Sequence, residues 1–95
     1  MFTSIAIVAT ETPERYAKQL ANHLGRKAEV RSEDAGERIV LGGGSCLLES
    51  RAGTLVLHAT ADDTDGRRRV EQVVGSHLER FGARNELTVT WVVDA

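Results

Sequence analysis

The feature that most constrains the fold is a change of hydrophobic period along the chain. Between residues 28 and 60 apolar and polar side chains alternate with period two, and the alternation is interrupted at EDAG, GGGS and RAG. Period two places successive side chains on opposite faces of a strand, and interruptions that contain glycine are typical of turns between antiparallel strands. This stretch therefore predicts a meander of three or four short strands.

Helical patterns flank the meander on both sides. Residues 13–24 carry an apolar stripe at helical spacing, with Thr12 as the predicted N-cap, Pro13 at the first position and Gly25 as a left-handed C-terminal cap. Residues 61–82 form a second helical pattern with carboxylates near its N-terminal end, where the helix dipole favours negative charge. The end segments TSIAIVAT and ELTVTWVV are rich in β-branched residues and indicate strands.

The predicted order is β-α-β(3–4)-α-β. Two amphipathic helices and a mostly antiparallel sheet bury their apolar surfaces best when both helices lie on one face of the sheet. We therefore predict an α+β two-layer sandwich, formed as a single domain over residues 1–95, with Trp91 between the layers. The opposite sheet face carries Glu49, Arg51 and His58, and is predicted to be polar and either wet or in contact with a partner.

Composition excludes several classes of function. The formal net charge is −2, so the chain lacks the basic field that holds phosphate backbones, and we expect no nucleic-acid binding. The single cysteine, Cys46, allows no internal disulfide, which fits a reducing compartment. The apolar run from Ile5 to Ala9 is too short for a signal peptide or a membrane helix. We expect a cytoplasmic protein that does not bind membranes.

His77 is the main candidate functional residue. On a helical projection it falls within the apolar arc of Val70, Val74, Leu78 and Phe81, so its ring is predicted to point inward. A buried imidazole is costly unless its nitrogens have hydrogen-bond partners. Two interpretations stay open at this point. His77 is either a neutral core histidine bonded to a backbone carbonyl or a threonine hydroxyl, or it lines a ligand pocket between helix and sheet.

Three other residues join His77 as candidate ligand-binding residues. Arg80 lies about 60° further round the same helix, and His23 lies at the edge of the apolar stripe of the first helix. Cys46 is either a small apolar residue of the core or a reactive thiolate, which would need a positive neighbour or a helix N-terminus. The spacings of these cysteine and histidine residues, with His58, match no short ligand pair of structural zinc sites. Metal and cofactor therefore stay unassigned.

Two other motifs have ordinary structural interpretations. GGGS, at residues 42–45, is followed by a strand rather than by a lysine and a helix, so it predicts a turn or bulge rather than a phosphate loop. The arginines at 67–69 follow three aspartates by about one helical turn, so local pairing and solvation explain them. A docking patch for an acidic partner is the alternative for these arginines.

Together the motifs resemble a known family. The framework VAT…P…RY…QL..H, then G..C.LE after a glycine turn, then SHLERFGARNELTVTW, is similar to domain of unknown function 2218 (DUF2218). That family consists of small bacterial proteins without an assigned activity. The last motif is the most specific and carries His77, Arg80, Phe81, Arg84 and Trp91; weaker positions are matched by His23, Lys27 and Cys46.

The resemblance implies a context of iron handling. Members of the family are joined to, or encoded beside, flavin reductases that release iron from siderophores, so such a reductase is the implied partner. This chain departs from the family pattern at Ala21 and Asn22, where a cysteine and a basic residue are often found, and near Lys27, where another histidine is common. The departure weakens the case for a shared cysteine and histidine metal site.

Three functions follow as alternatives. The first is a non-catalytic binding or accessory module, linked to iron or siderophore handling, with a pocket lined by His77, Arg80, His23 and Cys46. The second is a small enzyme that uses Cys46 as nucleophile and His77 as base. The third is a homodimer that assembles through its outer sheet face or its last strand. We favour the first, because the chain has no strong nucleophile motif such as G-x-S-x-G.

Overall fold

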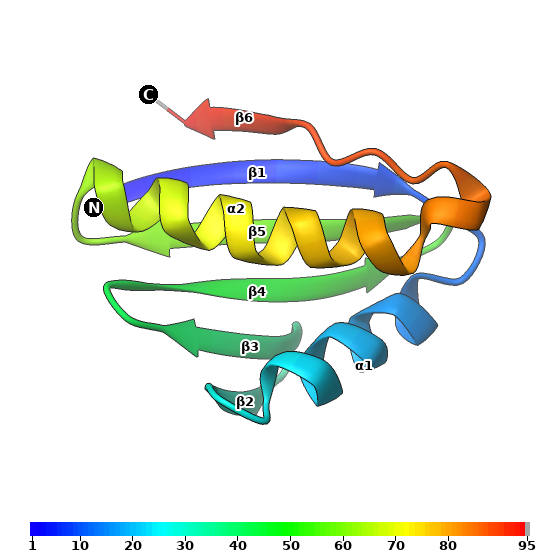
Figure 1. Cartoon of the computed structure of the whole chain (residues 1–95), viewed down its shortest axis with the longest axis horizontal. Coiled ribbons are helices and arrows are strands. Elements are labelled where there is room, and N and C mark those ends of the chain that lie inside the picture. The colour runs from blue at the N-terminus through cyan, green and yellow to red at the C-terminus, as the bar shows by residue number, and fades with distance from the viewer. Residues whose placement is uncertain (95) are drawn as a thin grey trace.

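The computed structural model describes residues 1–94 (Figure 1). The elements, in chain order, are β1 (Phe2–Ala9), α1 (Pro13–Leu24), β2 (Glu29–Glu33), β3 (Gly36–Leu41), β4 (Gly44–Arg51), β5 (Thr54–Ala61), α2 (Thr64–Phe81), the 3-10 turn η1 (Ala83–Asn85) and β6 (Trp91–Asp94). Four strands lie between the helices, which is the larger of the two predicted numbers.

The six strands form one sheet in the order β2-β3-β4-β5-β1-β6, and every neighbouring pair is antiparallel. The meander β2–β5 forms one side of the sheet, and β1 lies between β5 and β6 (Figure 1). Helix α1 contacts β3, β4 and β5, helix α2 contacts β1, β4 and β5, and the two helices contact each other. The predicted sandwich, with both helices on one face of an antiparallel sheet, is confirmed.

The core lies between the helices and the middle of the sheet. Cys46 and Leu48 of β4, and Leu55, Leu57 and Ala59 of β5, are buried on the helix side, as the alternation predicts. The helices contribute Tyr16, Ala17, Leu20, Leu24, Val70, Val74 and Leu78 to the same cluster. Neither described helix is long and apolar enough to cross a lipid bilayer.

The other face of the sheet carries no helix, and we call it the open face. Nε2 of His58 donates a hydrogen bond to Oε1 of Glu49 at 2.8 Å, and Arg51 lies 3.2 Å from the same carboxylate. The hydrogen bond from His58 holds the pKa of Glu49 below its ordinary value, and Arg51 adds to the effect. The predicted polar residues Glu49, Arg51 and His58 do lie on this face, together with the apolar Leu47 and Val56.

Both predicted caps of α1 are wrong in detail. Pro13 begins the helix, but the Thr12 side chain makes no cap hydrogen bond; instead the Thr12 amide donates to Oγ1 of Thr10 at 3.1 Å. Gly25 has φ −63°, which is right-handed rather than left-handed. Space rather than backbone conformation accounts for this glycine, because a Cβ there would lie 2.6 Å from the carbonyl oxygen of Ala21.

The last strand begins later than predicted. The sequence predicts a strand over ELTVTWVV, but β6 covers only Trp91–Asp94. Leu87, Val89 and Trp91 still pack half-buried against the core, so the alternation is right and Trp91 lies against the helix layer as predicted. The amide of Val89 donates to Oε2 of Glu79 at 3.0 Å. This bond joins the segment before β6 to α2.

One polar contact joins the two layers. Ser4 of β1 is fully buried, and its Oγ donates a hydrogen bond to Oε2 of Glu71 on α2 at 2.6 Å. Arg67, one helical turn earlier, lies 3.2 Å from the same carboxylate oxygen. A buried hydroxyl is costly without a partner, so Glu71 makes this position tolerable for a serine.

The glycine motif has the structural role that the sequence predicts, and the arginine motif has it only in part. Gly42 and Gly43 form the turn between β3 and β4, and Gly43 has φ +84°, a conformation that favours glycine. Arg67 is ion-paired within α2, and Nη1 of Arg69 lies 3.5 Å from the carbonyl oxygen of Gly42. Local pairing therefore accounts for Arg67 alone, and its partner is Glu71 rather than an aspartate; Arg69 contacts the β3–β4 turn, and Arg68 is exposed.

Candidate functional site

His77 lies on α2, one turn before the helix ends, and its ring is half-buried. Its Nδ1 is 2.6 Å from the carbonyl oxygen of Val73, one turn earlier. A carbonyl oxygen only accepts hydrogen bonds, so Nδ1 carries the hydrogen and Nε2 of the neutral ring keeps its lone pair. The prediction of an inward ring is therefore corrected. His77 lies at the margin of the core and bonds a backbone carbonyl, while Thr88 and Thr90 are exposed.

His23 and Phe81 complete a cluster of three rings with His77. The ring centroids of His23 and His77 are 5.1 Å apart with planes at 45°. Phe81 lies 5.4 Å from His23, nearly edge to face at 83°, and 6.4 Å from His77. His77 and Phe81 are four residues apart on α2, so they share one side of the helix, and His23 reaches them from α1. We call these residues the ring cluster.

The ring cluster is open to solvent on one side. His23 is exposed and His77 is half-buried, so a ligand in water can reach both rings. A depression of about 450 Å³ runs along α2 and ends at His77. Its lining includes Asp65, Arg68, Arg69, Gln72, Ser76 and His77. This position of His77, at the mouth of a surface depression, is the geometric basis for a binding site.

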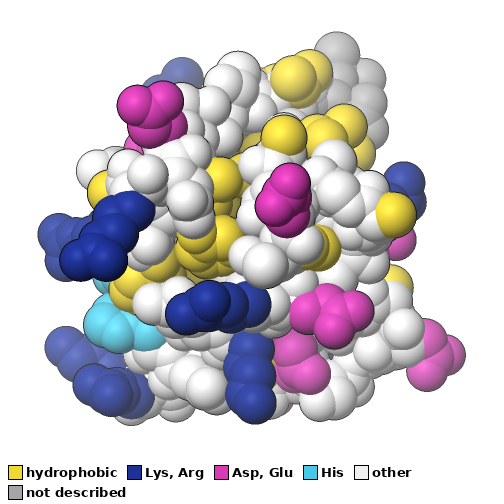
Figure 2. Space-filling model, turned by 90° about the vertical axis from the view of Figure 1, so that its right-hand side faces the viewer, with side chains coloured by type: hydrophobic (Ala, Val, Ile, Leu, Met, Phe, Trp, Pro, Cys, Tyr) yellow, Lys and Arg dark blue, Asp and Glu magenta, His cyan; other side chains and the backbone are white. Residues whose placement is uncertain are grey.

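Basic side chains surround the ring cluster. Arg80 follows His77 by three residues and is exposed, and Lys27 follows His23 by four, just beyond the end of α1. In Figure 2, histidine side chains (cyan) at the left of the view lie between lysine and arginine side chains (dark blue). Glu79 is engaged elsewhere, with the amide of Val89. The site is therefore locally basic although the whole chain carries a net charge of −2.

Cys46 does not share this environment. Its exposed fraction is 0%, and its sulfur lies 3.9 Å from the carbonyl oxygen of Leu47. Burial raises the pKa of the thiol to about 12, so it is protonated at neutral pH. A ligand that reaches exposed His23 from water does not reach this sulfur. Cys46 therefore fills space in the core, which is the first of the two interpretations of this residue.

A preformed metal centre is not apparent. Within residues 1–94, no group of three or more histidine, cysteine, aspartate or glutamate side chains is placed to hold a metal ion. His58 lies on the open face of the sheet, bonded to Glu49, whereas the ring cluster lies between the helices. The three histidines are thus divided between two separate surfaces.

Sequence reasoning missed Phe81 as part of the site and the contact between His23 and His77. The spacing of His77 and Phe81 was a usable signal, since residues four apart on a helix are neighbours on its surface. The contact across the helices had no such signal, because it depends on how α1 and α2 pack. Arg80 and His23 lie at the positions round their helices that the sequence predicts.

Comparison with known proteins places the chain in a structural context. The NMR structure of PA4090 from Pseudomonas aeruginosa is similar, with a TM-score of 0.80 and 29% sequence identity over 97% of this chain and 96% of that one. A de novo designed protein, LFR1 1, with a ferredoxin fold matches with a TM-score of 0.56 and 16% identity over 99% of this chain and 83% of that one. The second likeness shows the fold alone. A search of curated protein sequences gives no match.

The family comparison agrees with the motif resemblance. The model of a family described as "Uncharacterized protein conserved in bacteria (DUF2218)" matches residues 5–92. That range runs from the middle of β1 to the middle of β6, and it contains all the elements between them and both histidines of the ring cluster. The chain therefore belongs to the DUF2218 family.

Proposed function

We propose that this protein is a small, non-catalytic binding module whose site is the ring cluster together with Arg80 and the basic depression along α2. One observation carries the proposal: His77 is fixed by its Nδ1 bond to Val73, while its Nε2 has no hydrogen-bond partner among residues 1–94 and lies at a solvent-accessible position. Histidines that bind ligands or metals commonly donate the other ring nitrogen to a backbone carbonyl, which sets the tautomer and the ring orientation.

The chemistry of the site favours an anionic ligand with flat rings. Arg68, Arg69 and Arg80 supply positive charge, and guanidinium groups pair with carboxylate or phenolate oxygens and stack on aromatic planes. The rings of His23 and Phe81 offer faces and edges for stacking. Ferric catecholate siderophores and haem are anionic and carry planar rings, so they fit this description.

The resemblance to the family supports the same class of ligand. An iron or siderophore ligand, a cytoplasmic location and a siderophore-iron flavin reductase as partner form one consistent setting for such a module. In this setting the protein holds or delivers the iron complex, and the reductase carries out the chemistry. The buried, protonated Cys46 argues for this binding role over an enzyme with a cysteine nucleophile.

The test compares ligand binding by four proteins: the wild type, His77→Gln, Arg80→Ala and the control His58→Gln. Each is titrated with a ferric catecholate siderophore, with haem and with Zn²⁺, and its urea midpoint is measured alongside. We expect the first two variants to bind at least about tenfold more weakly, which is the effect of losing roughly 1.4 kcal/mol of contact energy. The control should bind as the wild type does, because His58 lies on the open face.

Two results would overturn the proposal. Equal affinity of all four proteins for a bound ligand would show that the ring cluster is not the site. No binding of the siderophore or of haem by the wild type, whether or not Zn²⁺ binds, would refute this class of ligand. A fall in the urea midpoint of His77→Gln without any change in affinity would assign His77 a structural role only.

A further inference from the structure

The open face of the sheet has two unlike halves. The cross-strand register places one row of side chains straight across all six strands: Arg31, Arg38, Leu47, His58, Ile5 and Val92. The part of the open face formed by β2, β3 and β4 carries charged side chains. The part formed by β1 and β6 carries the apolar side chains of Ile5, Ile7 and Val92, and we call these three residues the apolar half.

The three side chains of the apolar half are exposed to solvent although they are large and hydrophobic. Ile7 is 68% exposed, Val92 67% and Ile5 37%. On β1, Ile5 and Ile7 point away from the core, whereas the smaller Ser4, Ala6 and Val8 are buried in it. Apart from Met1, every exposed large hydrophobic residue of the described chain lies on β1 or β6. Figure 2 shows yellow side chains in the upper part of the molecule, where β6 and β1 lie in Figure 1.

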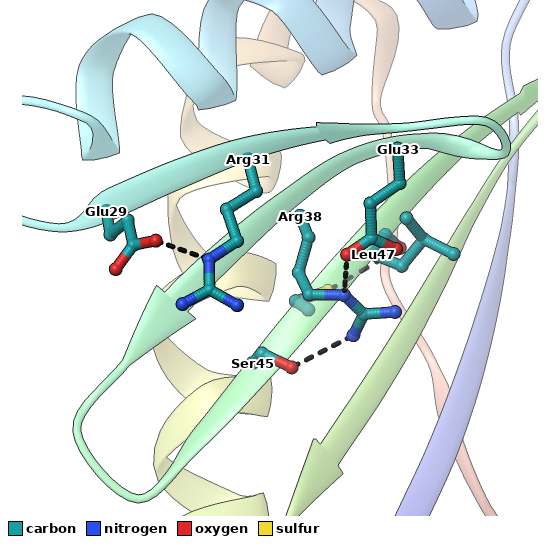
Figure 3. A network of polar contacts seen from close by, with 7 residues as sticks. Glu29, Arg31, Glu33, Arg38, Ser45 and Leu47 are labelled. Carbon is teal, nitrogen blue, oxygen red and sulfur yellow. Dashed lines mark hydrogen bonds and ion pairs between the residues drawn. The ribbon is translucent and has the colours of Figure 1, made fainter.

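The charged half is already satisfied within the chain. Figure 3 shows Arg31 bonded to Glu29, and Arg38 bonded to both Glu33 and Ser45. The bond from Arg38 to Glu33 is 2.7 Å long, and each of these arginines lowers the pKa of its glutamate partner. This half therefore needs no partner to neutralise it.

The balance of charge on this face suits a second copy of the same chain. Among the side chains that the structure describes on the open face, three glutamates face three arginines: Glu29, Glu33, Glu49, Arg31, Arg38 and Arg51. In a two-fold interface each surface meets itself, so a face of one sign would repel its copy. These six side chains are balanced in charge, although the whole chain carries a net charge of −2.

The area of the face also fits a dimer. Six strands at about 4.8 Å spacing, the longest with 8 residues of about 3.3 Å each and the shortest with 4, give a face of at most roughly 24 by 26 Å. That area is of the order of the roughly 800 Å² of accessible surface that each partner contributes to a standard interface. We propose that two copies of the chain associate through their open faces, with Ile5, Ile7 and Val92 of each copy forming the apolar part of the contact.

The edge of the sheet offers a matched control. Val92 and Val93 are neighbours on β6, but Val92 is on the open face opposite Ile5, whereas Val93 is opposite Ser4 on the helix side. Val93 is 48% exposed, so a polar residue is tolerated at either position. Glutamate at 7, 92 or 93 adds the same charge. Only the first two positions lie in the proposed contact.

The experiment is sedimentation velocity of the whole chain over a wide concentration range, for wild type, Ile7→Glu, Val92→Glu and Val93→Glu. We expect the wild-type average mass to rise toward twice the chain mass. Ile7→Glu and Val92→Glu should raise the dimer dissociation constant by about tenfold or more, since each places an unpaired carboxylate in an apolar contact. Val93→Glu should behave as the wild type does, and circular dichroism should show all four folded.

Two outcomes overturn this inference. A wild type that stays monomeric at the highest concentration refutes the dimer. Loss of association by Val93→Glu equal to that by Val92→Glu would place the contact at the edge of β6 rather than on the open face. Ligand binding at the ring cluster should be unchanged in Ile7→Glu, because the cluster lies between the helices on the other side of the sheet.

Discussion

The two faces of the sheet differ in the environment of their polar and reactive groups, which are buried on one face and in contact with water on the other. On the helix-covered face, Cys46 and Leu57 have no exposed surface, and the one buried polar side chain of the described chain, Ser4, is bonded to Glu71. On the open face, His58 and Glu49 form a bonded pair in contact with water. The difference shows that a residue type says little about its role until its partners are known. A histidine, a cysteine and a serine each have an ordinary structural use here.

The largest expected contrast is the reactivity of Cys46. With a pKa of about 12, its thiolate fraction at pH 8 is about a thousandfold below that of a free cysteine, whose pKa is about 8.5. Burial adds a barrier to access. Labelling with Ellman's reagent should therefore be negligible in buffer and rapid in denaturant. Comparable labelling rates in the two conditions would show that the helix-covered face opens readily to solvent. The two faces would then not differ in the protection they give to reactive groups.

A smaller contrast is expected from two truncations of aliphatic side chains. Leu57→Ala, on the covered face, should lower the free energy of unfolding by about 2 to 5 kcal/mol, because it removes buried contacts and leaves a cavity. Ile7→Ala, on the open face, should change it by no more than about 0.5 kcal/mol at low protein concentration. Urea titrations followed by circular dichroism measure both. A cost for Ile7→Ala that grows with concentration would sharpen the comparison by showing that a copy covers this side chain.

The smallest contrast concerns Glu49 and pH. Its pKa lies below the ordinary value of 4.5, chiefly because His58 donates to the carboxylate. A lowered pKa stabilises the fold above the unfolded value, and that stabilisation is lost as the pH falls through the folded value. Between pH 7 and pH 3 the urea midpoint of the wild type should thus fall more than that of Glu49→Gln. Parallel pH profiles would mean that the pair contributes nothing, as is common for exposed ion pairs.

Much of this architecture follows from the sequence by simple periodicity. The alternation in β4 and β5 correctly assigns Cys46, Leu48 and Leu57 to one face, because each strand has a clear difference between its two sides. The start of β6 was not predicted, because the segment before it is bonded to Glu79 of α2 through the amide of Val89 instead of pairing with β1. Such a contact between helix and segment has no local pattern.

The candidate site was predictable only in part. Helical geometry places His77, Phe81 and Arg80 on neighbouring positions of one helix. The meeting of His23 with His77 depends on how two helices pack, which sequence spacing does not encode. The exclusion of Cys46 from the site also needed the structure, because the sequence favours a core role for a strand cysteine but does not exclude a reactive one.

The hydrogen bond between Ser4 and Glu71 affects the register in which β1 pairs with β5 and β6. Both sides of this strand are apolar, so hydrophobicity alone does not oppose a slip of one residue, which would turn Ile5 and Ile7 toward the helices. Such a slip would carry the Ser4 hydroxyl away from Glu71 and leave a carboxylate and Arg67 without it at the layer boundary. The Ser4 hydroxyl thus favours one register of β1 over a register shifted by one residue. One polar residue excludes the misaligned sheet that its hydrophobic neighbours would allow.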